Sequence, residues 1–178
     1  MKWVSHEIVT GMAVYAATGA LLPTACAMAG AVLPDWLEGK GGGVRLPWAG
    51  LFAHRGWSHW PLLYVLALLA VEASGMEDGW LQTALSGLPD LGAGGWGLPA
   101  AVSGDGAASF GLPDIVRFLL VGALFHIAED AVCGKVPLLH PRKKVGLRLF
   151  RVGSFGEYAF SLAAVAALYA VGRWVAGG

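Results

Sequence analysis

The chain has 178 residues, of which 56% are hydrophobic and 13% charged, and its mean hydropathy is +0.61. Typical globular domains carry about 25% charged residues, so this composition indicates a chain surrounded largely by lipid and excludes intrinsic disorder. Lys plus Arg and Asp plus Glu number 12 each, and this zero net charge argues against a nucleic-acid-binding surface. We therefore expect one membrane-embedded domain over residues 1–178, an all-α polytopic bundle of about five helices.

The first predicted element is a short helical hairpin. Residues 8–33 contain no charge, exceed the ~20 residues that one span needs, and include helix-interrupting glycine and proline. They predict two antiparallel helices, at 5–18 and 23–33, with Ser5 as the N-cap of the first. Small-residue triplets here resemble signal-peptide cleavage sites, but the apolar run continues past them, so we expect the hairpin to stay in the membrane.

The rest of the chain alternates between polar loops and apolar helices. A polar loop at 34–58 precedes a glycine-rich loop at 75–112, which has acids, no Lys or Arg, and an expected interfacial helix near 80–85. A basic loop covers residues 135–153. The predicted spans between and after these loops are residues 60–73, 113–133 and 155–175.

Following these crossings brings the polar residues to one face of the membrane. The hairpin returns the chain to its starting side, the next two spans cross and cross back, and the last span begins on that same side. All five histidines and three acids lie there: His6, His54, His59, His126, His140, Asp35, Asp130 and Glu157. Ten of the twelve basic residues share this side, so the positive-inside bias places it in the cytoplasm.

His126 and Asp130 are one helical turn apart, so their side chains face the same way and could share a metal ion. Ionisable groups in membrane helices are costly and usually functional. The alternative is that Asp130 only accepts a hydrogen bond from His126. Glu129 is expected to point elsewhere, and it would replace Asp130 only if the helix were wound differently.

A second cluster at residues 54–59 places His54 and His59 beside Arg55 at the start of a span. Imidazoles suit zinc and similar metals, and a guanidinium can hold a phosphate through two hydrogen bonds. The alternative is that Arg55 and His59 anchor the span at the interface. Ser58 is expected to cap the following helix rather than to act as a nucleophile.

Three residues complete the candidate set. Asp35 follows the predicted second helix, where a carboxylate opposes the helix dipole, so it is either a ligand or general base or simply a solvated loop residue. His6 could face the cluster or lie at the interface. Glu157 begins the last span, where it could act in catalysis or only complement the dipole. Histidines and carboxylates without cysteine are typical of a hydrolytic zinc or manganese site.

The order of these motifs resembles the LexA-regulated, membrane-bound metal-dependent hydrolases of bacteria. The matching pieces span nearly the whole chain: His6, Leu33-Pro34-Asp35, His54 to His59, His126 to Asp130, Val136 to Pro141, and Gly153 to Glu157. The resemblance implies similarity to zinc-dependent phospholipase C, and it implies these metal ligands: His6, Asp35, His59, His126 and Asp130, with His54 in addition. The chain departs from the family pattern at Leu37, where members often have Asp, and at His140, where Trp or a similar residue is usual.

We therefore expect a multi-pass protein of the bacterial inner membrane that hydrolyses a lipid or membrane-associated phosphoester. Zinc or manganese would be the cofactor, and Asp35, Glu157 and Arg55 would act in catalysis. The expected partners are the lipid bilayer, a lipid phosphoester and an oligomer or larger membrane complex, with no nucleic acid. The alternative is a non-catalytic component of a secretion or conjugation machine, in which the cluster is structural. A metal-free lipid phosphatase and a transporter fit the motifs less well.

Overall fold

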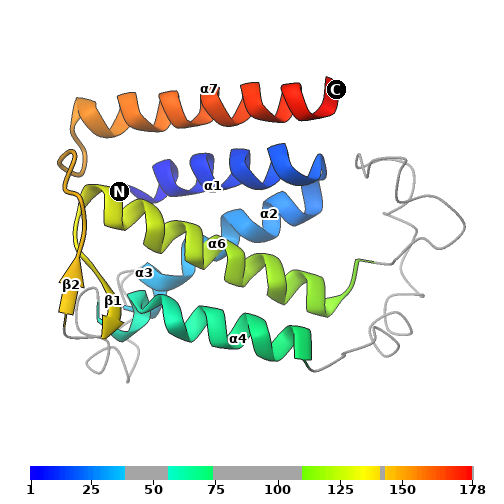
Figure 1. Cartoon of the computed structure of the whole chain (residues 1–178), viewed down its shortest axis with the longest axis horizontal. Coiled ribbons are helices and arrows are strands. Elements are labelled where there is room, and N and C mark those ends of the chain that lie inside the picture. Colours follow the sequence, from blue (N-terminus) through cyan, green and yellow to red (C-terminus); the bar gives the residue numbers. More distant parts are fainter. Residues whose placement is uncertain (39–55, 74–109, 141–142, 178) are drawn as a thin grey trace, which may run out of the picture.

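The computed structural model describes residues 1–38, 56–73, 110–140 and 143–177, which form a helical bundle with one small hairpin (Figure 1). The elements are α1 Trp3–Thr18, α2 Leu21–Gly30, α3 Leu33–Leu37, the 3₁₀ helix η2 Trp57–His59, α4 Pro61–Ala73, α6 Leu112–Cys133, β1 Val136–His140, β2 Lys143–Val145 and α7 Phe155–Gly177. The prediction of a mainly helical chain is confirmed. The predicted interfacial helix near 80–85 lies outside the described residues.

The N-terminal hairpin forms, but its details differ from the prediction. Helix α1 begins after Lys2, so Ser5 is not its N-cap; Ser5 lies in the first turn, and its hydroxyl donates to Glu157. Helix α1 ends at Gly19, whose φ of +65° is a left-handed conformation that glycine adopts without strain. The Gly19 amide donates to the carbonyl of Tyr15, and the chain turns there into α2.

The predicted second helix is two helices. Helix α2 ends at Gly30 and α3 begins at Leu33, with Pro34 in its first turn, because a proline lacks the amide that would continue the α2 ladder. Asp35 therefore lies in the first turn of α3 and not after a helix C-terminus. Its carboxylate favours the dipole there, so the expected opposition to the dipole is wrong.

Helices α2 and α6 approach each other through glycines. A Cβ atom on Gly122 would lie 1.9 Å from the carbonyl oxygen of Ala27, and one on Gly30 would lie 2.1 Å from that of Leu119. Any side chain at either position would separate the two backbones, and small residues at membrane helix contacts have this role. The glycines thus fix α6 against α2, with Gly122 one turn before His126.

The expected all-α class is corrected at residues 136–145, where β1 and β2 pair antiparallel, with Val136 opposite Val145. In Figure 1 the strands run across the helix axes at one end of the bundle. The chain then returns along α6, where the amides of Leu147 and Leu149 donate to the carbonyls of Ala131 and Val132. Those carbonyls lie in the last turn of a helix and would otherwise lack a partner. The pairing depends on this tertiary contact, so local sequence did not reveal it.

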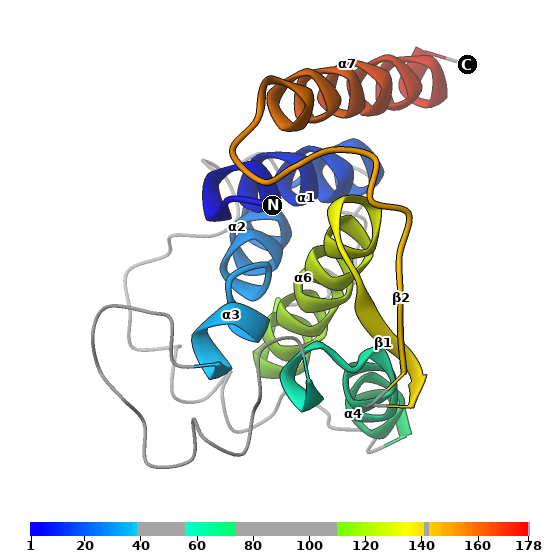
Figure 2. The same cartoon turned by 90° about the vertical axis from the view of Figure 1, so that its left-hand side faces the viewer.

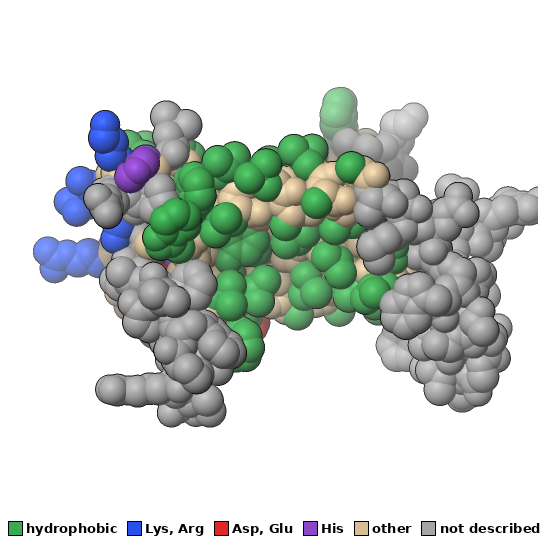
Figure 3. Space-filling view, turned by 90° about the horizontal axis from the view of Figure 1, so that it is seen from below, with side chains coloured by type: hydrophobic (Ala, Val, Ile, Leu, Met, Phe, Trp, Pro, Cys, Tyr) green, Lys and Arg blue, Asp and Glu red, His purple; other side chains and the backbone are tan. Residues whose placement is uncertain are grey.

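Among the described residues, one segment, Phe155–Trp174, forms a helix long and apolar enough to cross a membrane. It lies in α7, which packs on α1 (Figures 1 and 2). Most of the surface of α7 is exposed, including Leu162 and Trp174. Helix α4 has 13 residues, fewer than the ~20 of a full span. Figure 3 shows hydrophobic side chains over the middle of one face of the bundle and Lys and Arg gathered at one end.

Candidate metal centre

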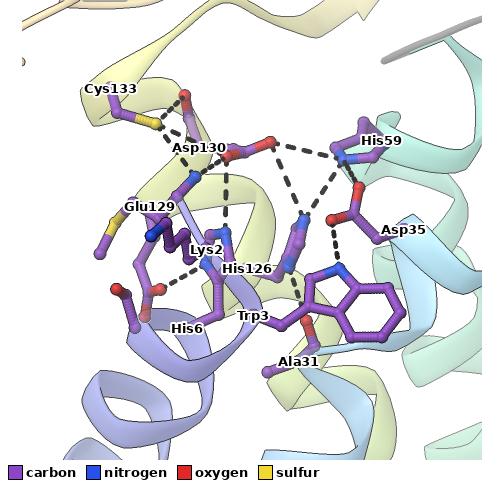
Figure 4. A network of polar contacts seen from close by, with 12 residues as sticks. Lys2, Trp3, His6, Ala31, Asp35, His59, His126, Glu129, Asp130 and Cys133 are labelled. Atoms are coloured by element: carbon purple, nitrogen blue, oxygen red, sulfur yellow. Dashed lines mark hydrogen bonds and ion pairs between the residues drawn. The ribbon is translucent and has the colours of Figure 1, made fainter. Parts of the chain in front are cut away.

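Polar side chains from α1, α3, η2 and α6 meet at the end of the bundle that carries the β1–β2 hairpin (Figures 1 and 4). The histidines among them are fully buried and the acids nearly so. His126, Glu129 and Asp130 come from the last turns of α6, and the other three come from α1, α3 and η2. The residues are His6, Asp35, His59, His126, Glu129 and Asp130.

Three donor atoms form a triangle at the centre of this cluster. His59 Nε2 lies 3.3 Å from His126 Nε2 and 3.5 Å from Asp130 Oδ2, and His126 Nε2 lies 3.8 Å from the same oxygen. Atoms bound to tetrahedral zinc at roughly 2.0–2.1 Å are about 3.3 Å from one another. The triangle therefore has nearly the size of one face of such a shell, and Asp35 Oδ1, 3.7 Å from His59 Nε2, extends it.

His6 offers a further donor on the other side of Asp130. His6 Nε2 is buried without a hydrogen-bond partner in the described part of the chain and lies 3.5 Å from Asp130 Oδ1. A buried nitrogen of this kind costs free energy unless something binds it. Two overlapping groups could hold a cation, with ligand atoms within 4.8 Å of one another: His6, His126 and Asp130, and Asp35, His59 and His126.

The other ring nitrogen of each histidine contacts an oxygen acceptor. The pairs of Nδ1 and oxygen are His126 with the Ala31 carbonyl at 2.5 Å, His6 with Glu129 Oε2 at 2.6 Å, and His59 with Glu38 Oε1 at 2.9 Å. Each contact holds a proton on Nδ1 and leaves the Nε2 lone pair for another partner. Histidines that bind metals usually donate their second N–H to a carboxylate or carbonyl in this way. All three rings are therefore oriented as Nε2 ligands.

The carboxylates are oriented as well. Trp3 Nε1 donates to Asp35 Oδ2 at 2.8 Å, which leaves Oδ1 directed at His59. The Met1 amine lies 2.7 Å from Asp130 Oδ1, and this charge and hydrogen bond outweigh burial and raise the pKa of the amine. Burial likewise lowers the pKa of His59, but hydrogen bonds with Asp130 and Glu38 outweigh it, so the net shift is upward. The site is thus a concentration of negative charge that attracts cations.

Glu157 lies fully buried at the start of α7 and faces a different set of donors. Its Oε1 accepts from the Lys2 amide at 2.6 Å and the Ser5 hydroxyl at 2.7 Å, and its Oε2 accepts from the Gly153 amide at 2.6 Å. This arrangement joins the start of α1 to the start of α7. Glu157 belongs to neither of the two groups that could hold a cation.

Other predicted residues fall elsewhere. His54 and Arg55 lie outside the described residues, and His140 is exposed on β1. Ser58 does not cap α4; its hydroxyl contacts Glu38 and His59 Nδ1, because η2 intervenes before α4 begins.

Two contacts were not anticipated from the sequence. Glu129 was expected to point elsewhere, yet it accepts from His6 and from Thr10, one turn further along α1. The pair of polar residues one turn apart in an apolar helix was the available signal for a buried carboxylate partner. Glu38 had no comparable signal, because η2 and its contact with His59 depend on tertiary structure.

Comparison with known proteins places the chain in a family. The sequence model of the YdjM inner membrane protein family matches residues 1–177, so the chain belongs to that family. No curated protein and no solved structure matches it.

Proposed function

We propose that this inner-membrane family member is a multi-pass, metal-dependent hydrolase of the bacterial inner membrane that acts on a lipid or membrane-associated phosphoester. One observation carries the proposal: three buried histidines each have Nδ1 bonded to an oxygen and Nε2 turned toward the carboxylates of Asp35 and Asp130. Burying so many ionisable groups is costly, and the Met1 ammonium pairs with Asp130 alone among the described carboxylates, so a further cation would stabilise the cluster.

Zinc is the cation that this donor set fits best, with manganese as the alternative, because the ligands are imidazole nitrogens and carboxylate oxygens. A bound ion of this kind lowers the pKa of water and polarises a phosphoryl oxygen. His59, His126 and Asp130 would hold it, with His6 and Asp35 on either side. Asp35 Oδ1 is also placed to take a proton, since Oδ2 is occupied by Trp3.

The remaining roles concern the substrate and its position. Arg55 would hold the substrate phosphate, and the exposed basic residues at this end would attract an anionic head group. The positive-inside bias supports a cytoplasmic orientation for this end of the bundle. Helices α4 and α6 would cross the membrane together with α7. The exposed basic residues are Lys2, Lys135, Lys143, Lys144, Arg148 and Arg151.

Metal analysis of the detergent-purified protein tests the proposal together with a phosphoester panel that includes phospholipids. We expect near-stoichiometric metal and metal-dependent turnover in the unmodified protein. Asp130→Asn keeps the shape of the side chain but removes its charge, so it should weaken metal binding and abolish turnover. Full metal occupancy and unchanged turnover in Asp130→Asn would contradict the mechanism.

A structural role for the same site is the second candidate, and the burial of the ligands favours it. His6, His59 and His126 have no exposed surface, as expected for a coordinatively closed site. In that case the chain is a non-catalytic membrane component whose folding depends on the ion. Stoichiometric metal without hydrolysis of any member of the panel would support this role over catalysis.

A further inference from the structure

A groove of about 240 Å³ runs between α1 and α7, away from the metal centre. Its walls include Val4 and Ile8 from α1 and Leu162 and Val165 from α7. One wall of the groove therefore belongs to the helix that is long and apolar enough to cross a membrane.

The few polar groups in the groove are already used. The Ser5 hydroxyl donates to Glu157 Oε1 at 2.7 Å, and the Ser161 hydroxyl donates to the Glu157 carbonyl at 3.0 Å. Both serine hydroxyls therefore donate to groups of the protein and not to an occupant of the groove. An occupant would meet mainly hydrocarbon, which suits an acyl chain and not a sugar or a polar peptide.

One end of the groove carries a positive charge. Tyr158 lines the groove, and Lys2 Nζ donates to its hydroxyl at 2.9 Å and lies 5.5 Å from its ring centroid. Lys2 is exposed, and the contact with Tyr158 raises its pKa, so the ammonium stays charged at neutral pH. Lys2 precedes α1, at the same end of the bundle as the exposed basic residues around the β1–β2 hairpin.

A second groove on the same helix provides a comparison. It lies between α1 and α2, has a volume of about 270 Å³, and includes Met12 and Met28 among its lining residues. Its lining also contains Glu7, so it presents a carboxylate where the first groove presents an ammonium. Size and hydrophobicity alone do not separate the two grooves, whereas charge does.

We propose that the α1–α7 groove is a binding site for an anionic phospholipid, with one acyl chain between Ile8 and Val165 and the phosphate on Lys2. The apolar walls select a hydrocarbon chain, and the ammonium at the end of the groove selects a negative head group. Lys2 is also one of the exposed basic residues proposed to attract an anionic head group, but none of the groove residues is a ligand of the metal centre, so lipid retention and metal content can be measured separately.

Lipid retention by the full-length protein tests this site. The protein is reconstituted in nanodiscs with equal parts of phosphatidylglycerol and phosphatidylcholine of identical acyl chains, and native mass spectrometry counts the lipid retained after release into detergent. We expect phosphatidylglycerol to be retained preferentially. Lys2→Ala should reduce that preference about five-fold, the ratio equivalent to the ~1 kcal/mol of one basic residue near an anionic surface, and Lys2→Arg should restore it.

Substitutions in each groove distinguish the contribution of the lipid acyl chain to retention from that of the head group. Val165→Phe should lower the retention of both lipids, whereas Met12→Phe and Glu7→Ala, in the α1–α2 groove, should leave retention unchanged. The Lys2 amide still bonds Glu157 in Lys2→Ala, so that variant keeps the contact between α1 and α7. Metal content, measured on the same samples, should stay constant and so distinguishes loss of lipid from loss of the metal centre.

Two outcomes would overturn the lipid site. The first is equal retention of the two lipids with no effect of Val165→Phe. The second is that Leu162→Cys cross-links two copies of the protein and no lipid is retained. That result would make the groove an interface between copies.

Discussion

The Nδ1 atom of His126 lies 2.5 Å from the carbonyl oxygen of Ala31, so a central ring of the polar cluster on α6 is bonded to the residue that ends α2. One turn earlier on both helices, Gly122 lies against the carbonyl of Ala27. The close packing of α6 on α2 at Gly122 and the orientation of the His126 ring by Ala31 therefore belong to the same helix contact.

Gly122→Ala should disturb both parts. Its Cβ would overlap the Ala27 carbonyl, so α2 and α6 must move apart and His126 must lose its anchor. We expect a lower thermal midpoint and weaker metal binding, measured by thermal melting and by competition with a chelator. Gly11→Ala is the control, because its Cβ would meet only the flexible side chain of Met28. Equal behaviour of the two variants would argue against this coupling.

His126→Ala should remove the metal, because His126 belongs to both groups that could hold a cation. The measurement is metal stoichiometry after purification in detergent. His140→Ala is the matched control: it removes an exposed histidine on β1 and should leave the metal content unchanged. Loss of metal from both variants would indicate adventitious binding to surface histidines.

Glu129→Gln should weaken metal binding without abolishing the fold. The amide keeps the size of the side chain but removes its charge, and it has one oxygen in place of the two that accept from His6 Nδ1 and the Thr10 hydroxyl. Loss of such a partner typically costs 10- to 100-fold in metal affinity, so a shift of about that size is expected in a chelator titration. Glu7→Gln, next to His6 on α1, serves as the control. An unchanged affinity in Glu129→Gln would show that the His6 ring needs no such partner.

Glu157→Ala should destabilise the protein while the metal centre keeps its ligands. The substitution leaves the buried Ser5 hydroxyl without an acceptor, at about 1–3 kcal/mol, and it also removes the acceptor of the two part-buried amides of Lys2 and Gly153, at a smaller cost each. The thermal midpoint in detergent should fall clearly more than in Glu72→Ala, which breaks an exposed ion pair with Arg117 that solvent screens. Normal melting with lost turnover would instead make Glu157 catalytic.

The orientation of the site can be tested by labelling in intact cells. In a chain with Cys26 and Cys133 replaced by alanine, Ser103→Cys should react with an impermeant reagent from outside the inner membrane. Lys144→Cys, at the exposed basic end, should react only after the membrane is opened. The reverse pattern would place the metal centre on the outer side.

The sequence predicted the meeting of His6, Asp35, His59, His126 and Asp130, because helix order alone determines which helix ends share a side. It did not predict how the rings are held. The Glu38 and Ala31 contacts arise from the 3₁₀ turn before α4 and from the end of α2, and neither position follows from hydrophobic periodicity. The β pair was missed for the same reason, since the segment after β2 bonds to carbonyls that become available only where α6 ends.

The three bonds to Glu157 also set an order of events during synthesis. The Lys2 amide and its acceptor are 155 residues apart in the chain, so α1 leaves the ribosome long before the carboxylate that fixes its first turn. Until α7 has been inserted, Met1 and Trp3 hold the start of α1, but the Lys2 amide and the Ser5 hydroxyl, which flank His6 on its N-terminal side, lack their acceptor. We expect a nascent chain stalled before residue 155 to capture metal poorly and to be the preferred target of membrane proteases, with full resistance acquired only when the last helix arrives.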